Sequence, residues 1–259
     1  MRLITLTTDF GLKDPFVASM KGVILSINPN VDIVDISHEI SPQDILEAAF
    51  VLASSWRYFP SETIHVAVVD PGVGSSRRPI LFYAGKHYFV GPDNGIFTFI
   101  YNDQKVESVI HATSCYYFRE TVDTTFHGRD IFAPIAAWLS KGIAPDKLGE
   151  PIENPVRLPI PSPKIMGDNL LEGEVIYIDR FGNIMTNITK RNLEQFSEDI
   201  KIVIKNKEIS GIVDFYAEGE GRGASALINS SGYLEIFIYR GNAKDSLGIN
   251  IGEKVYLRI

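Results

Sequence analysis

The segment 68–78 (VVDPGVGSSRR) places several chemically useful residue types close together. Asp70 follows an apolar run, a glycine-rich turn comes next, and Arg77 and Arg78 close the loop. A separation of seven or eight residues allows one arginine to fold back onto the aspartate, whose carboxylate would then stay ionised. The segment therefore predicts an acid and a guanidinium in one cleft, although an arginine pair in a loop is more often solvated surface charge.

The glycine turn in this segment matches neither common phosphate-binding pattern. No Gly-Lys-Ser/Thr follows Gly72 and Gly74, and the GxGxxG fingerprint of dinucleotide-binding folds is incomplete. The two glycines suit a backbone that turns tightly and approaches a ligand, or simply a plain loop.

A second acid stands at the end of a predicted strand. Asp9 follows the β-rich run 3–7, as Asp70 follows the run 64–69. An acid at such a position can hydrogen-bond a ribose diol, although a turn-capping aspartate is equally common. Because ligands bind at the carboxyl ends of strands in open α/β sheets, two strand ends with this feature favour ligand binding.

One histidine stands where it can take part in chemistry. His127 precedes a predicted helix at 131–139, whose N-terminus is electropositive, so it can act as a general base or an orienting group. A lone histidine is nevertheless more often structural. The other histidines show no partner spacing and form no HxxxH or HExxH motif, so no metal site is expected: His38, His65, His87 and His111.

Two polar turns in the second half of the chain have side chains that can bind a nucleoside. Asn183 ends the turn 179–183 (DRFGN), and its amide can pair with an adenine edge. A similar turn spans 229–232 (NSSG). By spacing alone, an ordinary β-turn explains both segments better.

The elements that must position these residues alternate between strand and helix in the first half. Asp14 is a predicted N-cap followed by Pro15 at the first helical position, and this helix runs to about residue 27. A second helix-start signal occurs at Ser41. This alternation predicts an α/β domain with a mixed, largely parallel sheet flanked by helices on both faces. The predicted strands are 3–7, 31–36, 64–69, and the hairpin 80–83 with 87–90.

The pattern changes after a proline-rich stretch. Prolines crowd 151–163, and short strand patterns separated by turns follow, with short helices near 190–196 and 243–247. Such a run predicts a small β-barrel or sandwich. The domain prediction is 1–155 for the α/β domain, 156–169 for a linker and 170–259 for the second domain. The expected strands are 173–179, 184–188, 202–204, 225–229, 234–239 and 255–259.

Composition argues against several classes of protein. The 259 residues carry a formal charge of −7 without a long basic stretch, so nucleic acid is not an expected partner. Cys115 is the only cysteine, which excludes an internal disulfide framework and a cysteine-based zinc site. No apolar run approaches the roughly 20 residues of a membrane span, and the chain opens directly into a strand. We therefore expect a cytoplasmic protein that does not bind membranes.

Six ordered segments together resemble a known family. They resemble the S-adenosyl-L-methionine (SAM) hydroxide adenosyltransferases, or adenosine-forming SAM hydrolases, which are related to fluorinases and chlorinases. The resemblance covers nearly the whole chain, and its specificity comes from the order of the segments, since each alone is weak. The segments are 8–11 (TDFG), 69–74 (VDPGVG), 91–95 (GPDNG), 126–130 (FHGRD), 179–183 (DRFGN) and 229–235 (NSSGYLE).

The resemblance implies an architecture and a reaction. It implies an N-terminal α/β domain, a C-terminal β-barrel, and a homotrimer with active sites between subunits. Water attacks C5′ of the ribose, expelling L-methionine and leaving adenosine, without a metal or an organic cofactor. Two alternatives stay open: a SAM-dependent 5′-halogenase and a non-catalytic protein that binds SAM or adenosine.

The resemblance also assigns residues. The catalytic set corresponds to Asp70, Arg77 and His127, with Arg78 as the neighbouring alternative to Arg77. Asp9 corresponds to the group that holds the ribose hydroxyls. The remaining substrate-binding assignments are Asn183 for adenine, Phe215 or Tyr216 for stacking on the base, Ser230, Ser231 and Glu235 for the pocket wall, and Asp14 and Asp179 for the methionine part.

The chain departs from the halogenases at two of these positions. Asp70 stands where halogenases carry a tyrosine in the halide pocket, and Gly128 stands where they carry a serine that donates to the halide. A carboxylate repels a halide anion but can orient or deprotonate water. The departure favours hydrolysis over halogenation.

Overall fold

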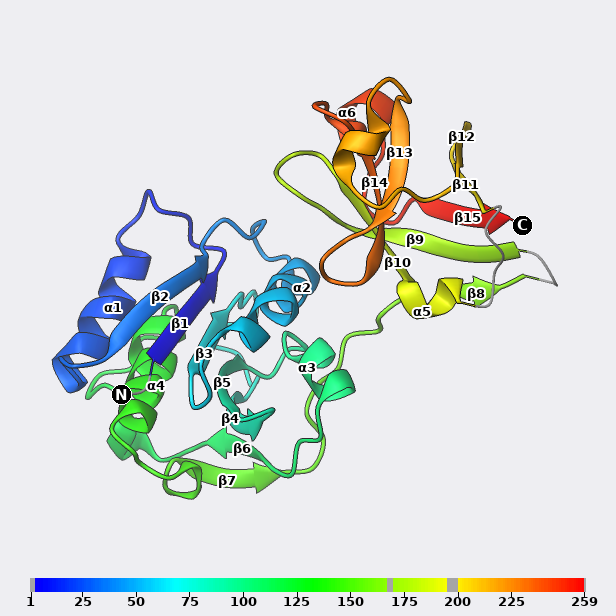
Figure 1. Cartoon of the computed structure of the whole chain (residues 1–259). Coiled ribbons are helices and arrows are strands. Elements are labelled where there is room, and N and C mark those ends of the chain that lie inside the picture. Colours follow the sequence, from blue (N-terminus) through cyan, green and yellow to red (C-terminus); the bar gives the residue numbers. More distant parts are fainter. Residues whose placement is uncertain (1–2, 167–169, 195–199, 259) are drawn as a thin grey trace. The chain divides into compact units, whose positions relative to one another are not determined.

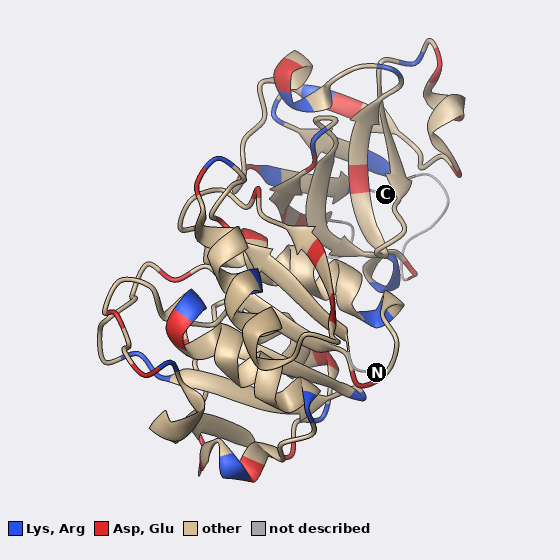
Figure 2. Ribbon diagram, turned by 90° about the vertical axis from the view of Figure 1, so that its left-hand side faces the viewer, with Lys and Arg blue, Asp and Glu red and all other residues tan. Residues whose placement is uncertain are grey.

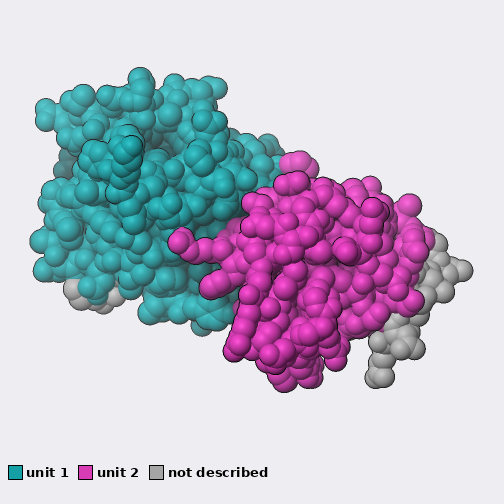
Figure 3. All heavy atoms as spheres, turned by 90° about the horizontal axis from the view of Figure 1, so that it is seen from above, with its two compact units in different colours: residues 1–158 teal, residues 159–259 magenta. Residues whose placement is uncertain are grey.

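The computed structural model describes residues 3–166, 170–194 and 200–258. The chain forms two compact units, Met1–Leu158 and Pro159–Ile259, which Figure 3 colours separately. The division falls within the proline-rich stretch. Of the linker proposed at 156–169, residues 167–169 lie outside the described residues, and Lys164–Ile165 forms the short strand β8.

The first unit contains a mixed sheet with the strand order β2-β1-β3-β5-β4-β6-β7. Neighbours from β2 to β5 run parallel, and β4, β6 and β7 pair antiparallel, which confirms the predicted mixed α/β sheet. Because β1 and β3 are adjacent and parallel, their carboxyl ends share one edge of the sheet. The strands are β1 (Leu3–Thr8), β2 (Asp32–Ser37), β3 (Ile64–Val68), β4 (Pro79–Ala84), β5 (His87–Pro92), β6 (Val109–Ala112) and β7 (Gly149–Ile152).

Helices cover both faces of this sheet (Figure 1). α1 (Phe16–Ile27) and α4 (Ala133–Ser140) pack in one apolar core, and α2 (Ile45–Ser55) and α3 (Thr98–Asp103) pack in another. The strands alternate between the two cores: Val66 and Val68 belong to the first, while Ala67 belongs to the second. Burial on both faces explains why β3 reads as a continuous apolar run. Short 3₁₀ segments complete the unit: η1 (Trp56–Tyr58), η2 (Cys115–Tyr117) and η4 (Pro145–Lys147).

Two helix starts differ from the sequence prediction. α1 begins at Phe16 with Pro15 as its N-cap and no side-chain cap, so the cap predicted at Asp14 was wrong. α2 begins at Ile45, and Asp44 caps it by accepting a hydrogen bond from the amide of Glu47. The start predicted at Ser41 fails because Gln43 adopts a positive φ of 67°, which a continuing helix cannot contain.

The helix predicted at 131–139 has an unusual beginning. A π-helical turn, η3 (Gly128–Phe132), precedes α4, so the α-helix begins two residues later than expected. Turns of this kind are frequent at functional sites. Here the turn sets the position of His127, the residue before it.

The second unit is an antiparallel sheet that curls into a nearly closed barrel, as expected. Its strand order is β12-β11-β15-β9-β10-β14-β13, and the two end strands contact each other. β12 was not predicted, and of the helix expected at 190–196, residues 195 and 196 lie outside the described residues. The elements are β9 (Leu170–Ile178), β10 (Ile184–Thr189), α5 (Lys190–Leu193), β11 (Lys201–Ile204), β12 (Lys207–Ser210), η5 (Tyr216–Gly219), β13 (Ala224–Ile228), β14 (Tyr233–Ile238), α6 (Ala243–Leu247) and β15 (Lys254–Arg258).

Acidic and basic positions are interspersed along the ribbon in Figure 2, rather than segregated by sign. Within the described residues, no helix is both long enough and apolar enough to cross a bilayer.

Gly91 provides a test of the packing between β5 and β3. A Cβ at this position would lie 2.3 Å from the carbonyl oxygen of Ala67, so we expect Gly91→Ala to lower the free energy of unfolding by about 1–3 kcal/mol. Gly22→Ala, on the open face of α1 with nothing within 4 Å of the added carbon, should raise it by up to about 1 kcal/mol. Urea unfolding of the two full-length variants measures both, and an unchanged Gly91→Ala protein would contradict the packing.

Candidate active site

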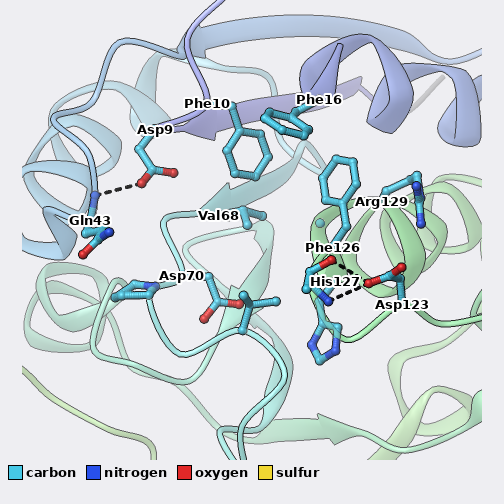
Figure 4. Close-up of a pocket in the computed structure, with 14 residues that line it drawn as sticks. Asp9, Phe10, Phe16, Gln43, Val68, Asp70, Asp123, Phe126, His127 and Arg129 are labelled. Atoms are coloured by element: carbon cyan, nitrogen blue, oxygen red, sulfur yellow. Dashed lines mark hydrogen bonds between the residues drawn. The ribbon is translucent and has the colours of Figure 1, made fainter. Parts of the chain in front are cut away.

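A pocket of about 700 Å³ opens in the first unit at the carboxyl ends of β1 and β3. Asp9 directly follows β1, and Asp70 follows β3 by two residues, so the parallel pairing of the strands brings both carboxylates to one cavity. Figure 4 shows both acids around the pocket together with Phe10, Phe16 and Phe126. The lining residues are Asp9, Phe10, Phe16, Gln43, Val68, Asp70, Pro71, Val73, Asp123, Thr125, Phe126, His127, Gly128 and Arg129.

Arg77 joins Asp70 to His127. Its Nε donates to both carboxylate oxygens of Asp70, at 3.0 and 2.9 Å, and its Nη2 donates to Oδ2 as well. The same Nη2 lies 2.6 Å from Nδ1 of His127. The side chains of Arg77 and Asp70 are only 9% and 5% exposed. The structure thus assembles the acid, the guanidinium and the histidine that the sequence singled out.

The glycine turn makes this assembly possible. Gly74 has a φ of +77°, and a Cβ on it would lie 2.4 Å from the carbonyl oxygen of Thr124. The turn after Asp70 therefore packs directly against the chain that leads to His127. Only glycine fits, because both the backbone conformation and the close approach exclude a side chain.

The guanidinium determines which nitrogen of His127 carries the proton. Arginine can only donate, so Nδ1 accepts the hydrogen bond from Arg77 and Nε2 carries the hydrogen of the neutral ring. Burial and the charge of Arg77 lower the pKa of His127, while the more distant Asp70, Asp130 and Asp123 oppose that shift. The ring is therefore neutral near pH 7 and presents an N–H donor.

Arg78, the neighbouring alternative, lies elsewhere. Its guanidinium pairs with the buried Asp93 and donates to the carbonyl oxygen of Asn154 at 2.7 Å. Asp93 also accepts a hydrogen bond from the amide of Val156. Arg78 thus secures the chain near the end of the first unit and does not contact Asp70 in the way that Arg77 does.

Asp9 is held by a residue that sequence reasoning missed. Oδ2 of Asp9 accepts a hydrogen bond of 2.8 Å from the backbone amide of Gln43, whose side chain also lines the pocket. The left-handed conformation of Gln43 makes this contact possible. Glutamine rarely adopts a positive φ, so the sequence carries no clear signal for this contact.

An aromatic wall also escaped prediction. Phe10, Phe16 and Phe126 meet edge to face with centroid separations of 5.4–5.9 Å. Arg129 lies over Phe126, 5.0 Å from its centroid. Their positions in the chain show no common periodicity, and only Phe10 and Phe126 fall within segments that the sequence analysis had marked.

Asp130 organises the chain that carries this wall. It is fully buried and accepts hydrogen bonds from the side chains of Arg119 and Arg129 and from the amide of Asp123. Hydrogen bonds from Arg129, Asp123 and Arg119 outweigh the effect of burial and lower the pKa of Asp130, which stays ionised.

The assigned residues of the second unit form local clusters of their own. Asp179 accepts hydrogen bonds from the amide and the side chain of Asn183, at 2.8 and 3.0 Å. The buried Glu235 accepts from the hydroxyl of Tyr216 at 2.7 Å. Burial and Glu235 raise the pKa of that phenol. The remaining assigned residues are exposed. They are Phe215, Ser230 and Ser231 in the second unit, and Asp14, just before α1, in the first unit.

Three of the other histidines have partners in the core. His38 lies between Thr8 and Asp35, and His65 contacts Thr5 and His87. Burial, aided by His87, lowers the pKa of His65 to about 3. Within residues 3–166, 170–194 and 200–258, no cluster of three or more His, Cys, Asp or Glu side chains is arranged to hold a metal ion.

Comparisons with known proteins identify the family. Residues 4–149 match the SAM hydroxide adenosyltransferase N-terminal domain, and residues 173–256 match the corresponding C-terminal domain. The chain belongs to the SAM hydroxide adenosyltransferase family.

Individual relatives cover the chain almost completely. An (R)-S-adenosyl-L-methionine hydrolase of Methanocaldococcus jannaschii is 37% identical over 98% of this chain and 94% of the relative. A hydrolase of the same name from Thermus thermophilus is 35% identical, covering 99% and 100%. A fluorinase of Nocardia brasiliensis is 27% identical, covering 90% and 89%. A crystal structure of an uncharacterized conserved protein from Thermotoga maritima superimposes with a TM-score of 0.91 at 31% identity, covering both chains fully.

The electrostatics of His127 can be measured directly. We expect its imidazole to titrate below 6.5 by NMR, and lower still in Asp70→Asn, because the carboxylate is one of the charges that raise its pKa. His111, whose pKa responds to Arg78, Asp93 and Glu150, serves as the internal control. Between the lowered pKa of folded His127 and its ordinary value of 6.5, the unfolded chain binds more protons than the folded chain. His127 therefore makes the fold less stable as the pH falls below 6.5. A His127 pKa that rises in Asp70→Asn would contradict the geometry.

Proposed function

We propose that this protein hydrolyses S-adenosyl-L-methionine to adenosine and L-methionine, with water attacking C5′ of the ribose. The observation that carries the proposal is the contact of Asp70, Arg77 and His127 beside a pocket that also contains Asp9. Membership of the family and the names of the hydrolase relatives support the same substrate.

The reaction needs a positioned nucleophile rather than an acid. The sulfonium leaves as a neutral thioether and takes the electron pair of the C5′–S bond, while the C5′–O bond forms and one proton is released. Holding water in line with the C5′–S bond is the main task of the protein. Supporting this, Asp70 and His127 both line the pocket.

The three side chains divide this task. The carboxylate of Asp70 has acceptor capacity beyond its bonds to Arg77, so it accepts a hydrogen bond or the proton from water. His127 donates from Nε2 and orients the oxygen. Arg77 keeps both groups in place, and its charge stabilises developing hydroxide. Its Nη1 is buried and has no hydrogen-bond partner among the described residues, so the guanidinium keeps donors in reserve.

The pocket also suits the cationic substrate. Asp9, Asp70 and Asp123 contribute carboxylates, and Phe10, Phe16 and Phe126 contribute ring faces and edges. Both features attract a sulfonium, as they attract other onium groups. Asp9 is proposed to bind the ribose hydroxyls.

The remaining substrate-binding assignments, all in the second unit except Asp14, are also proposals. We assign Asn183 to the adenine and either Phe215 or Tyr216 to stacking on it. Ser230, Ser231 and Glu235 complete the wall, and Asp14 and Asp179 serve the methionine part. We further propose that the protein is cytoplasmic, needs no cofactor and forms a homotrimer with sites between subunits. For a homotrimer, light scattering should give a mass three times that of one chain.

Asp70→Asn tests the activation of water. The substitution keeps the size of the side chain but removes its charge, so we expect kcat to fall at least about 100-fold while KM changes only a few-fold. Asp146→Asn, at a carboxylate that is 71% exposed, is the matched control and should retain wild-type kinetics. Near-normal turnover by Asp70→Asn would remove Asp70 from the mechanism.

The products decide between the proposed reaction and its alternatives. Turnover in H₂¹⁸O should place the heavy oxygen in adenosine, and both sulfonium epimers should be tried because the relatives are named for the (R) form. A 5′-halo-adenosine formed in chloride or fluoride would indicate a halogenase, although the fluorinases are the more distant relatives at 24–27% identity. Binding without turnover of either epimer would indicate a non-catalytic SAM-binding protein.

A further inference from the structure

His38 is a buried histidine for which the proposed mechanism has no use. It follows β2 and is only 4% exposed. Its Nδ1 lies 2.8 Å from the hydroxyl of Thr8, and its Nε2 lies 3.0 Å from the carboxylate of Asp35. Thr8 is the last residue of β1, immediately before Asp9. The histidine therefore connects an acid at the surface to the strand end that enters the pocket.

His38 contacts a hydroxyl with one ring nitrogen and faces a carboxylate with the other. Nε2 lies 3.0 Å from a carboxylate, an acceptor, although it is not aligned for a hydrogen bond. In the neutral ring Nε2 therefore carries the hydrogen, and Nδ1 accepts from the hydroxyl of Thr8. The hydroxyl oxygen in turn accepts from the amide of Phe10 at 3.2 Å. At the outer end, Lys21 donates to Asp35 at 2.6 Å. The hydrogen bond from Lys21 and the proximity of His38 outweigh the effect of burial and lower the pKa of Asp35.

His38 also holds the other end of the same turn. Its carbonyl oxygen accepts a hydrogen bond of 2.7 Å from the amide of Gly11, which has a φ of +63°. The turn 8–11 is thus attached to His38 at both ends, through a side chain at Thr8 and through the backbone at Gly11. Asp9 and Phe10, the two residues between these attachments, both line the pocket.

We propose that His38 is a positioning residue that, through Thr8, fixes the turn carrying Asp9 and so sets the affinity for the ribose hydroxyls. The proposal rests on the proposed function only in assigning the ribose to Asp9. The hydrogen-bonded clamp itself is independent of any reaction. His38 touches no reacting atom in this scheme, so its removal acts on binding rather than on the attack of water.

The strand β1 offers a matched comparison. Thr5, three residues earlier, pairs with Nδ1 of buried His65 at 2.7 Å, almost the same contact as that of Thr8 with His38. The pair of Thr5 and His65 continues to His87 rather than to the turn. Thr5→Val and Thr8→Val therefore each remove one hydroxyl from a buried histidine, but only Thr8→Val releases the amide of Phe10.

The first experiment measures nucleoside affinity by calorimetry with the full-length chain. In Thr8→Val we expect adenosine to bind about 10-fold more weakly and 2′,3′-dideoxyadenosine to bind as it does to the wild type. The reason is that only adenosine has ribose hydroxyls that can donate to Asp9. Thr8→Ser keeps the hydroxyl and should retain the wild-type preference for adenosine over 2′,3′-dideoxyadenosine. Thr5→Val should leave the preference unchanged even where it lowers stability. Equal preferences in Thr8→Val and Thr5→Val would overturn the proposal.

Two further measurements separate this proposal from the proposed function. In Thr8→Val, KM for SAM should rise while kcat stays within a few-fold, and a collapse of kcat with unchanged KM would overturn the positioning role. Amide hydrogen exchange at Phe10 and Gly11 needs no ligand and should be faster in Thr8→Val than in Thr5→Val. If the wild type neither binds adenosine nor hydrolyses SAM, the proposed function fails, and the exchange rates alone support or overturn the clamp.

Discussion

The buried guanidinium of Arg77 is the group on which the pocket depends. A charge with so little exposure destabilises a fold by several kcal/mol unless it is paired and hydrogen-bonded. Asp70 supplies the opposite charge and His127 supplies a neutral acceptor, 50 positions further along the chain than Arg77. Both partners together offset the desolvation of Arg77, so the fold and the chemical arrangement stabilise each other.

The surrounding structure serves mainly to bring these partners within reach. Parallel pairing of β1 and β3 places two strand ends at one edge of the sheet. Asn94 donates to the carbonyl oxygen of Val69, directly before Asp70, and Gly74 admits the chain that leads to His127. Asp130 also secures that chain, because its carboxylate accepts hydrogen bonds from three of its residues: Arg119, Asp123 and Arg129.

Three histidines of the first unit have different surroundings because their partners differ. Nδ1 of His127 faces a guanidinium and must accept, whereas Nε2 of His38 lies 3.0 Å from the carboxylate of Asp35. His65 contacts another histidine within the apolar core, where protonation is strongly disfavoured. Spacing in the sequence could not distinguish them, since each state depends on strands or loops that are distant in the chain.

Local patterns were enough to predict the alternation of strands and helices, the change to an antiparallel barrel, and the acids at two strand ends, because apolar periodicity and turn residues act over a few positions. The choice of Arg77 over Arg78 was suggested by the family resemblance, but its physical basis is tertiary: Asp93 and Asn154 hold Arg78 elsewhere. The aromatic wall, the left-handed Gln43 and the clamp by His38 had no local signal. Each of them depends on contacts between distant segments, and only the folded chain brings those segments together.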